Sequence, residues 1–323
     1  MRAWVCHRLS DDRSGLRFEP HWHDPPEPGP NQVRVRLSAA ALNYPDLLML
    51  GGGYQHKPEL PFIPGMEAAG VIDEVGEGLV GDLIGQRVIV GTRGGGLAEL
   101  ITVDAAQVRP VPHGLHDDEA AAHSVGALTA YVALAVRGRV AAGERVLVLG
   151  AGGGMGLAAV ATARALGARV VAATTNAAKD EAIRAAGAQD VQVIDRAMPD
   201  LAAFKGRIDV VYDPVGGAAF EPALRSLAWN GRYLVVGFVA GRPDPLPINR
   251  LLLKGIEIIG VRAGEHGRRD PAAGAAAQRA IDELAEGGMR PHIGMRVSLE
   301  RADELFAAMA EGRVVGKAVA LIE

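Results

Sequence analysis

The chain has 323 residues, 22% of them charged, and a formal net charge of −4 at pH 7. This length suggests about two domains, and the ordinary charged fraction excludes a disordered chain and a coiled-coil rod. The mildly negative charge argues against a nucleic-acid binder or a polybasic membrane-surface protein, so we expect a small-molecule ligand and no nucleic-acid or membrane partner.

Residues 1–120 have the pattern of a β-rich domain. Short apolar segments recur between Pro and Gly residues, as expected for strands joined by turns. The 42 glycines of the chain, nearly twice the usual share of ~7%, indicate many turns with special backbone angles. The sequence predicts strands at 2–6, 32–42, 67–76, 86–91, 97–103 and 106–112.

A single cysteine, Cys6, cannot form an internal disulfide or a cysteine-based zinc site, so we expect a small buried or edge residue in a cytoplasmic protein. The first residues also lack the apolar stretch of a secretory signal. Two uncharged runs, 120–136 and 146–163, approach the length of a membrane span. Both are rich in Ala and Gly, and polar residues such as His123 interrupt the first, so we expect neither to cross a membrane.

From about residue 145 apolar strands alternate with Ala-rich helices, the pattern of parallel βαβ units. Helices are predicted at 156–166 and 178–186, each followed by a glycine, Gly167 and Gly187, at the position that favours a left-handed backbone. After Val261 we expect an Ala-rich helix and a second helix near 301–311. The sequence predicts a doubly wound, six-stranded parallel sheet from strands at 145–150, 169–174, 191–194, 208–213, 232–238 and 256–261. This sheet does not need the final strand, 317–323, which we expect to return to the first domain.

The turn after the first of these strands fits a dinucleotide-binding motif. Ala151, Gly153 and Gly156 form an AxGxxG pattern, with Gly154 and Met155 inside it. A strand precedes the pattern, a helix follows it and a second strand closes the unit, which is the context that makes the motif specific. We expect Gly153 to admit a pyrophosphate and Gly156 to permit close helix packing. The alternative is a tight turn without a ligand.

The end of the second parallel strand points to NADPH. An NAD enzyme usually has an acidic residue there, which binds the ribose hydroxyls. This chain has Thr175 and Asn176, followed by Lys179, which can donate hydrogen bonds to a 2′-phosphate. The sequence therefore favours NADPH over NADH. Lys179 could instead be a solvated lysine on the helix surface.

Several further segments lie at spacings typical of a known family: residues 41–79, 128–134, 212–217 and 316–321. Together with the AxGxxG segment they resemble the zinc-independent quinone oxidoreductase branch of the medium-chain dehydrogenases/reductases, over nearly the whole chain. The resemblance implies an α/β fold with a GroES-like β-rich catalytic domain at 1–120, completed by 264–323. It also implies a Rossmann NADP-binding domain at 121–263 and an active site in the cleft between the two domains.

Zinc alcohol dehydrogenases of the same superfamily carry metal ligands at positions where this chain has Asn43, Met66 and, nearby, Val125. None of these three side chains is a usual zinc ligand. We therefore expect no metal, and a substrate carbonyl that is polarised by hydrogen bonds.

Two residues are predicted to be catalytic from this resemblance. Asn43 matches the family's asparagine beside the nicotinamide ribose, and Tyr44 next to it is expected to contact the cofactor. Tyr54 matches a tyrosine credited as the proton donor in related enoyl-thioester reductases. The alternative for Tyr54 is a wall of the substrate pocket, because a tyrosine with a pKa near ~10 needs tuning to transfer a proton efficiently.

The remaining cofactor contacts are also predicted. Thr129 resembles a residue that binds near the nicotinamide, although it could instead cap a helix. Strand ends in open α/β sheets bind ligands, so the segments after two predicted strands should contribute Val215, Gly237, Phe238 and Val239. Arg196 is expected to pair with the 2′-phosphate, unless Ile194 occupies that place. Lys317, of the closing GK, can reach the cofactor or be solvated.

Three functions remain open. The first is an NADPH-dependent reductase that transfers a hydride to a quinone or an α,β-unsaturated carbonyl. The second is a noncatalytic, crystallin-like NADPH-binding protein, and the third is an enoyl-thioester reductase, which needs a basic groove that is not visible in the sequence. We also expect a homodimer in which segment 256–261 pairs with its counterpart, because a long apolar edge strand otherwise promotes aggregation.

Overall fold

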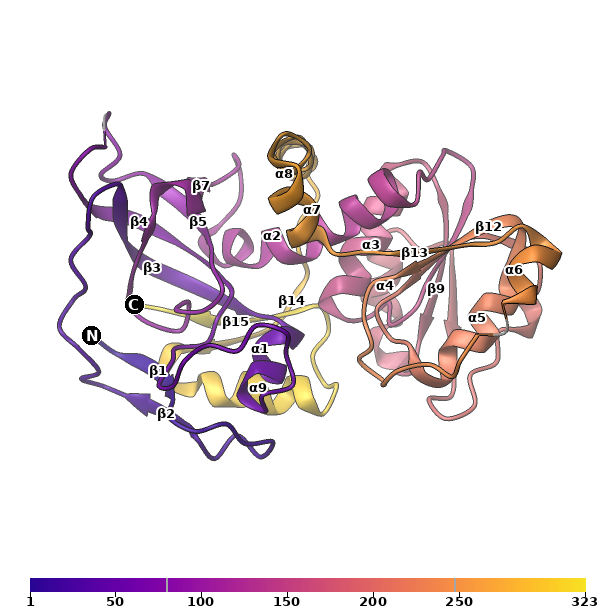
Figure 1. Cartoon of the computed structure of the whole chain (residues 1–323), viewed down its shortest axis with the longest axis horizontal. Helices are drawn as coiled ribbons and strands as arrows, with labels where there is room; N and C mark the ends of the chain where they lie inside the picture. Colours follow the sequence, from indigo (N-terminus) through magenta and orange to yellow (C-terminus); the bar gives the residue numbers. More distant parts are fainter. Residues whose placement is uncertain (80, 247) are drawn as a thin grey trace. The chain divides into compact units, whose positions relative to one another are not determined.

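The computed structural model describes residues 1–79, 81–246 and 248–323, which form two compact units. The first unit contains Met1–Val125 and Ile293–Glu323, and the second contains Gly126–His292. The expected boundaries therefore need a correction, since 121–125 belong to the first unit and 264–292 to the second. Helix α7 (Ala263–Arg269) packs on the π-helix Val132–Arg137, and α8 (Pro271–Glu286) packs along α7, which keeps both with the second unit (Figure 1).

The first unit is β-rich, as predicted. Strand β3 alternates buried Val33 and Val35 with the more exposed Arg34 and Arg36, because one face of the sheet packs on the core. A two-stranded sheet, β1 (Ala3–Cys6) with β2 (Leu16–Glu19), lies in the same unit, and Cys6 is buried, as expected. The main sheet has the order β14-β15-β3-β4-β5-β7, with β6 also paired to β3. Its strands are β3 (Gln32–Leu42), β4 (Glu67–Val75), β5 (Arg87–Gly91), β6 (Leu100–Asp104), β7 (Val108–Pro110), β14 (Ile293–Ser298) and β15 (Lys317–Leu321).

The chain's last strand returns to the first unit, which confirms the prediction. Strand β15 pairs antiparallel with β3, Ala320 opposite Ala40, and Figure 1 shows the yellow end of the chain beside indigo β3. Helix α9 (Ala302–Ala310) packs against β14 and β15. Strand β14 was not predicted, because Gly294 and Arg296 interrupt its short apolar pattern.

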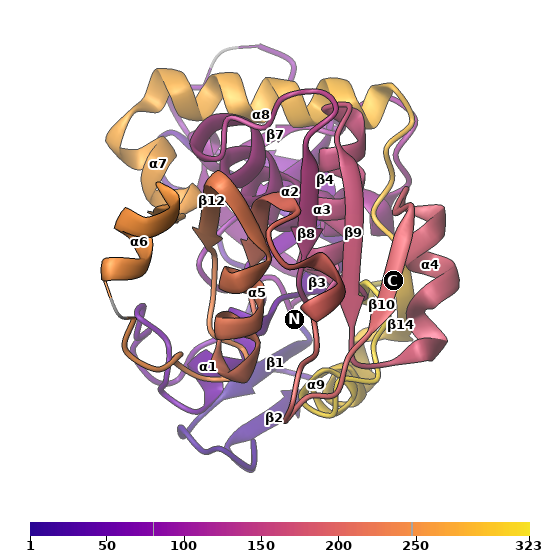
Figure 2. The same cartoon turned by 90° about the vertical axis from the view of Figure 1, so that its right-hand side faces the viewer.

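The second unit contains the predicted six-stranded parallel sheet, in the order β10-β9-β8-β11-β12-β13. Figure 2 shows β10, β9, β8 and β12 of this sheet. Helices α3 (Gly154–Ala165) and α4 (Asp180–Ala185) pack against β8–β10, and α5 (Phe220–Ser226) packs against β11 and β12. The strand order reverses between β8 and β11, which is the switch point at which such sheets bind ligands. The strands are β8 (Arg145–Val148), β9 (Arg169–Thr174), β10 (Asp190–Val193), β11 (Ile208–Asp213), β12 (Leu227–Val235) and β13 (Glu257–Gly260).

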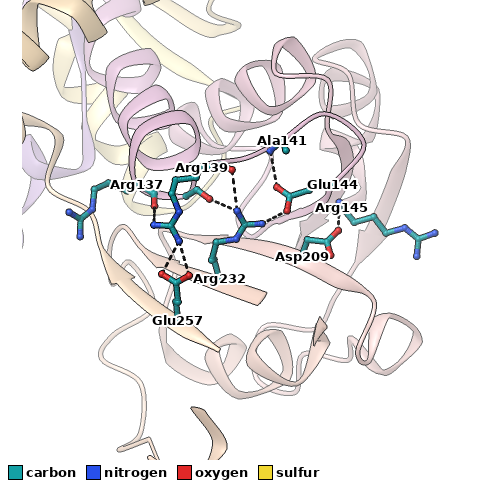
Figure 3. Close-up of polar contacts among 9 residues, drawn as sticks. Arg137, Arg139, Ala141, Glu144, Arg145, Asp209, Arg232 and Glu257 are labelled. Carbon is teal, nitrogen blue, oxygen red and sulfur yellow. Dashed lines mark hydrogen bonds and ion pairs between the residues drawn. The ribbon is translucent and has the colours of Figure 1, made fainter. Parts of the chain in front are cut away.

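A polar network closes the amino edge of this sheet (Figure 3). Arg139, just before β8, donates to both oxygens of Glu257 on β13, at 2.7 and 2.8 Å. Arg232, on β12, donates to the carbonyl oxygen of Gly138 at 2.7 Å and pairs with Glu144. These contacts attach the segment before β8 to two other strands, and they leave the carboxyl edge as the side where ligands bind in open sheets.

Helix α2 (Asp117–Tyr131) continues into the π-helix Val132–Arg137. By length and composition alone, Asp117–Arg137 could cross a membrane. Buried core helices of soluble proteins often have the same length and composition. Of its most apolar window 56% is buried inside the protein, which fits a core helix. Helices α1 (Tyr44–Leu50) and α6 (Asn249–Lys254) complete the set described here.

Candidate functional site

The turn between β8 and α3 is shaped for close approach of a ligand to the backbone. Gly150 has a φ of 61°, in the left-handed region, and Gly153 caps α3. A Cβ atom on Gly156 would lie 2.2 Å from the carbonyl oxygen of Gly150 and 2.6 Å from Cα of Ala151, so only glycine fits there. The first N–H groups of α3 have no partner within the helix, as at every helix start, and they favour an anion.

The residues after β9 lie beside this turn. Asn176 caps the following turn by accepting from the N–H of Ala178 at 3.0 Å, and Thr175 is exposed. Lys179 is only 8% exposed, because its aliphatic stem packs over Gly152. The interpretation of Lys179 as a solvated lysine is therefore wrong.

Two cationic side chains, Lys179 and Arg196, follow the carboxyl ends of β9 and β10. Burial, and then the positive charge of Arg196, lowers the pKa of Lys179, which places these two side chains near each other. Ile194 packs into the core of the second unit, whereas Arg196 is exposed. Of the two alternatives at this position, the structure therefore favours Arg196 as the side chain that is available to an anion.

The loops after β11 and β12 form the other half of the carboxyl edge. The N–H of Ala240 donates to the carbonyl oxygen of Val215 at 2.8 Å, so the two loops are joined. A Cβ on Gly150 would lie 2.9 Å from Val215 Cγ2, which places Val215 against the glycine turn. Phe238 and Val239 are about half exposed. At this edge the structure gathers the expected residues Ala151, Gly153, Gly154, Met155, Gly156, Lys179, Arg196, Val215 and Gly237.

The first unit holds a buried carboxylate at the start of α1. Asp46 is fully buried and accepts the N–H of Asn43 at 2.8 Å and that of Gly65 at 3.1 Å. Burial raises the pKa of Asp46 to about 7, although these two hydrogen bonds and the charge of Lys317 oppose the rise. Asp46 thus fixes the backbone of Asn43, the residue that caps α1.

The side chain of Asn43 is fixed by a buried ion pair. Its Nδ2 donates to Glu67 Oε1 at 2.9 Å, and its Oδ1 accepts from Lys317 Nζ at 2.8 Å. Lys317 also pairs directly with Glu67, whose other oxygen accepts the N–H of Val125 at 2.8 Å. Glu67 is 0% and Lys317 5% exposed, so the interpretation of Lys317 as a solvated lysine is wrong.

Tyr54 and Thr129 lie in different units. Tyr54 is partly buried on the loop after α1, and Tyr44 is the first residue of that helix. Thr129 lies inside α2, near its end, so it does not cap a helix and that alternative is wrong. The proposed contacts of Tyr44, Tyr54 and Thr129 with cofactor or substrate stay predictions.

Sequence reasoning missed Glu67 and also Tyr233, whose hydroxyl donates at 2.7 Å to buried Asp213, the last residue of β11. Glu67 is the first residue of β4, and Tyr233 lies within β12. A polar side chain that is buried in a strand must find a hydrogen-bond partner. A carboxylate at the start of the run EAAGVI was the available signal for Glu67. Among residues 1–79, 81–246 and 248–323, no three His, Cys, Asp or Glu side chains are grouped so that they could hold a metal ion.

Comparison with known proteins agrees with this architecture. Residues 29–113 match the model of the alcohol dehydrogenase GroES-like domain, and 154–286 match that of the zinc-binding dehydrogenase family. Quinone oxidoreductase-like protein 2 of Bos taurus is 35% identical over 294 residues, covering 89% of this chain and 84% of the relative. Acryloyl-coenzyme A reductase of Sulfurisphaera tokodaii is 31% identical over 326 residues, covering 90% and 92%.

Among solved structures, the quinone oxidoreductase of Thermus thermophilus, which was also solved in complex with NADPH, is similar at a TM-score of 0.84. It is 34% identical, and the match covers 99% of this chain and 100% of that one. The shared domains, the nearly full-length relatives and this fold lead to one conclusion: the chain belongs to the zinc-independent quinone oxidoreductase branch of the medium-chain dehydrogenase/reductase superfamily.

Proposed function

We propose that the chain is an NADPH-dependent oxidoreductase that works without a metal and reduces a quinone or an α,β-unsaturated carbonyl. The observation that carries the proposal is the glycine turn at the switch point, with Lys179 and Arg196 beside it. When bound, NADPH supplies a hydride from its nicotinamide ring. The donor set supports the metal-free part, since Asn43, Met66 and Val125 replace the ligands of the zinc enzymes.

The chain's own residues bind and orient the cofactor, and they supply a proton to the acceptor. The turn Ala151–Gly156 and the start of α3 bind the pyrophosphate, and Lys179 and Arg196 bind the 2′-phosphate. Asn43, held by Glu67 and Lys317, orients the nicotinamide end, and Tyr44, Thr129, Thr175, Asn176, Phe238 and Val239 line the cofactor. Tyr54 donates the proton that completes reduction of the acceptor.

The first prediction concerns cofactor preference. Lys179→Ala removes one of two cations, so we expect about a tenfold or greater loss of NADPH affinity and less than a twofold loss of NADH affinity. Fluorescence titration with both nucleotides measures this. Lys205→Ala is the matched control. Lys205 is an exposed lysine that precedes β11, at the amino ends of the strands and away from the proposed nucleotide site. Equal losses for both nucleotides would mean that Lys179 does not contact the 2′-phosphate.

The second prediction concerns turnover. Tyr54→Phe removes the proposed proton donor, so we expect kcat to fall about 100-fold while the Kd for NADPH stays within twofold. The assay follows NADPH oxidation with a panel of quinones, enals and enoyl-thioesters. An unchanged kcat would leave Tyr54 as a pocket wall. A wild-type protein that binds NADPH but reduces no acceptor in the panel would favour the noncatalytic, crystallin-like function.

An enoyl-thioester substrate is the second candidate, favoured by the similarity to acryloyl-coenzyme A reductase. Such a substrate needs a basic groove that leads to the nicotinamide, because its long phosphopantetheine arm ends in phosphates. The structure does gather cations around one pocket, but these lie near the amino ends of β11 and β12, opposite the nucleotide edge: Lys205, Arg225, Arg250 and Lys254. We therefore rank a small quinone or enone first.

The third prediction is a homodimer joined through β13. Among the residues that the structure describes, this edge strand of the six-stranded sheet pairs only with β12. Ile248, Leu252 and Leu253 before it are at least 70% exposed. We expect light scattering at micromolar concentration to give about twice the chain mass of 33.7 kDa. Replacing both leucines, Leu252→Asp with Leu253→Asp, should shift the protein towards monomer. A wild-type mass of one chain contradicts this part of the proposal.

A further inference from the structure

A buried carboxylate holds the loop after β11. Asp213, the last residue of β11, is 2% exposed and accepts the N–H groups of Val215 at 2.7 Å and Gly216 at 2.8 Å. Its other oxygen, Oδ2, accepts the hydroxyl of Tyr233 on β12 at 2.7 Å. Three donors therefore converge on one carboxylate, which fixes the start of this loop to the neighbouring strand.

Backbone hydrogen bonds extend this arrangement to the loop after β12. The N–H of Val236 donates to the carbonyl oxygen of Asp213 at 2.8 Å, and Gly217 donates to Gly241 at 2.9 Å. Gly217 has a φ of 53°, and a Cβ there would lie 2.7 Å from the carbonyl oxygen of Ala240. Loops 214–217 and 236–241 therefore form one packed layer. We expect its shape to depend on Asp213, the residue at its base.

The strand order assigns this layer to one half of a dinucleotide. Lys179 and Arg196 follow β9 and β10, so the adenosine half, which carries the 2′-phosphate, belongs on that side of the switch point. The other half of the dinucleotide then lies over β11 and β12, where the layer is. This step rests on the proposed use of NADPH.

We propose that Asp213 and Tyr233 are positioning residues for the nicotinamide half of NADPH, acting through loops 214–217 and 236–241. Neither side chain needs to touch the ligand, because both are buried beneath the loops. Burial raises the pKa of Asp213, and its three hydrogen-bond donors lower it. Loss of any donor therefore makes the ionised form of this carboxylate less stable.

The neighbouring strand offers a matched control. Tyr212 and Tyr233 are both 0% exposed, and they lie on adjacent strands. Within the part of the chain that the structure describes, the Tyr212 hydroxyl has no hydrogen-bond partner, whereas that of Tyr233 donates to Asp213. Removing either hydroxyl deletes the same atom from a buried ring, and only one of the two deletions breaks a hydrogen bond.

The test measures two affinities for each variant, by calorimetry with NADPH and with 2′,5′-ADP, which has only the adenosine half. We expect Tyr233→Phe to weaken NADPH about tenfold and 2′,5′-ADP less than twofold, and Tyr212→Phe to change neither. Asp213→Asn keeps an oxygen for the loop N–H groups, so it should retain more NADPH affinity than Asp213→Ala. Circular dichroism confirms that each variant is folded, and if Asp213→Ala unfolds, Tyr233→Phe decides.

Two results would overturn the inference. Equal losses of both ligands in Tyr233→Phe would indicate a general structural role, and identical behaviour of Tyr233→Phe and Tyr212→Phe would show that the hydrogen bond to Asp213 is unimportant. Failure of the wild-type protein to bind either ligand would instead refute the proposed function, so the two failures are distinguishable.

Discussion

Gly156→Ala is expected to weaken NADPH binding at least about 100-fold, the largest loss of cofactor affinity of any single substitution proposed for this chain. The new Cβ would lie 2.2 Å from the carbonyl oxygen of Gly150, and this backbone atom cannot move without opening the turn that we propose as the pyrophosphate site. Fluorescence titration with NADPH measures the loss, and circular dichroism shows whether the fold is kept.

A second glycine provides the control for this substitution. Gly264 lies in the first turn of α7, as Gly156 lies in the first turn of α3, but a Cβ there meets only the end of the Arg268 side chain, at 3.6 Å. We expect Gly264→Ala to leave NADPH affinity within twofold of the wild type. If Gly156→Ala also binds NADPH normally, the glycine turn is not the pyrophosphate site.

Lys317→Met is expected to destabilise the protein by about 3–5 kcal/mol, the largest stability effect. The substitution leaves Glu67 buried at 0% exposure without the cation that pairs with it. Lys317→Met combined with Glu67→Gln removes both charges, so it should recover most of that loss. Urea unfolding of the two variants gives the comparison.

An exposed ion pair of the same unit serves as the control. Arg313 and Glu311 form a pair whose side chains are both more than half exposed, so Arg313→Met should hardly change the free energy of unfolding. A loss for Lys317→Met no greater than that of Arg313→Met would show that the buried pair is unimportant. A double variant that is no more stable than Lys317→Met alone would show that uncompensated charge is not the cause.

The six strands of the second unit and its helices α3 and α4 could be predicted from the sequence, whereas α5 and α6 were not predicted. Its strands β8, β9 and β11 are mostly apolar and mostly buried, so each stands out as a continuous run. Gly167 and Gly187 do have positive φ angles at the ends of their helices. The first unit was harder, because β14 is short and its pattern is broken by Gly294 and Arg296. The boundary near 264 was misplaced, since α7 and α8 follow tertiary packing that no local pattern reveals.

Some residues of the candidate site could likewise be predicted from the sequence, and others could not. The glycine turn and Lys179 were predicted because close approach and phosphate binding demand particular residues at fixed spacings, and the structure does place the two side by side. Their contacts with NADPH stay predictions. Partners that are distant in the chain could not be predicted: Lys317 pairs with Glu67 across 250 positions, and Tyr233 reaches Asp213 from the neighbouring strand. Such contacts depend on strand order, which becomes known only once the fold is known.

The central claim is that the carboxyl edge of the second unit holds NADPH. Isothermal titration calorimetry of the wild-type chain with NADPH and NADH tests it most directly. The account predicts one NADPH bound per chain, at least about tenfold more tightly than NADH. No detectable binding of either nucleotide would contradict it.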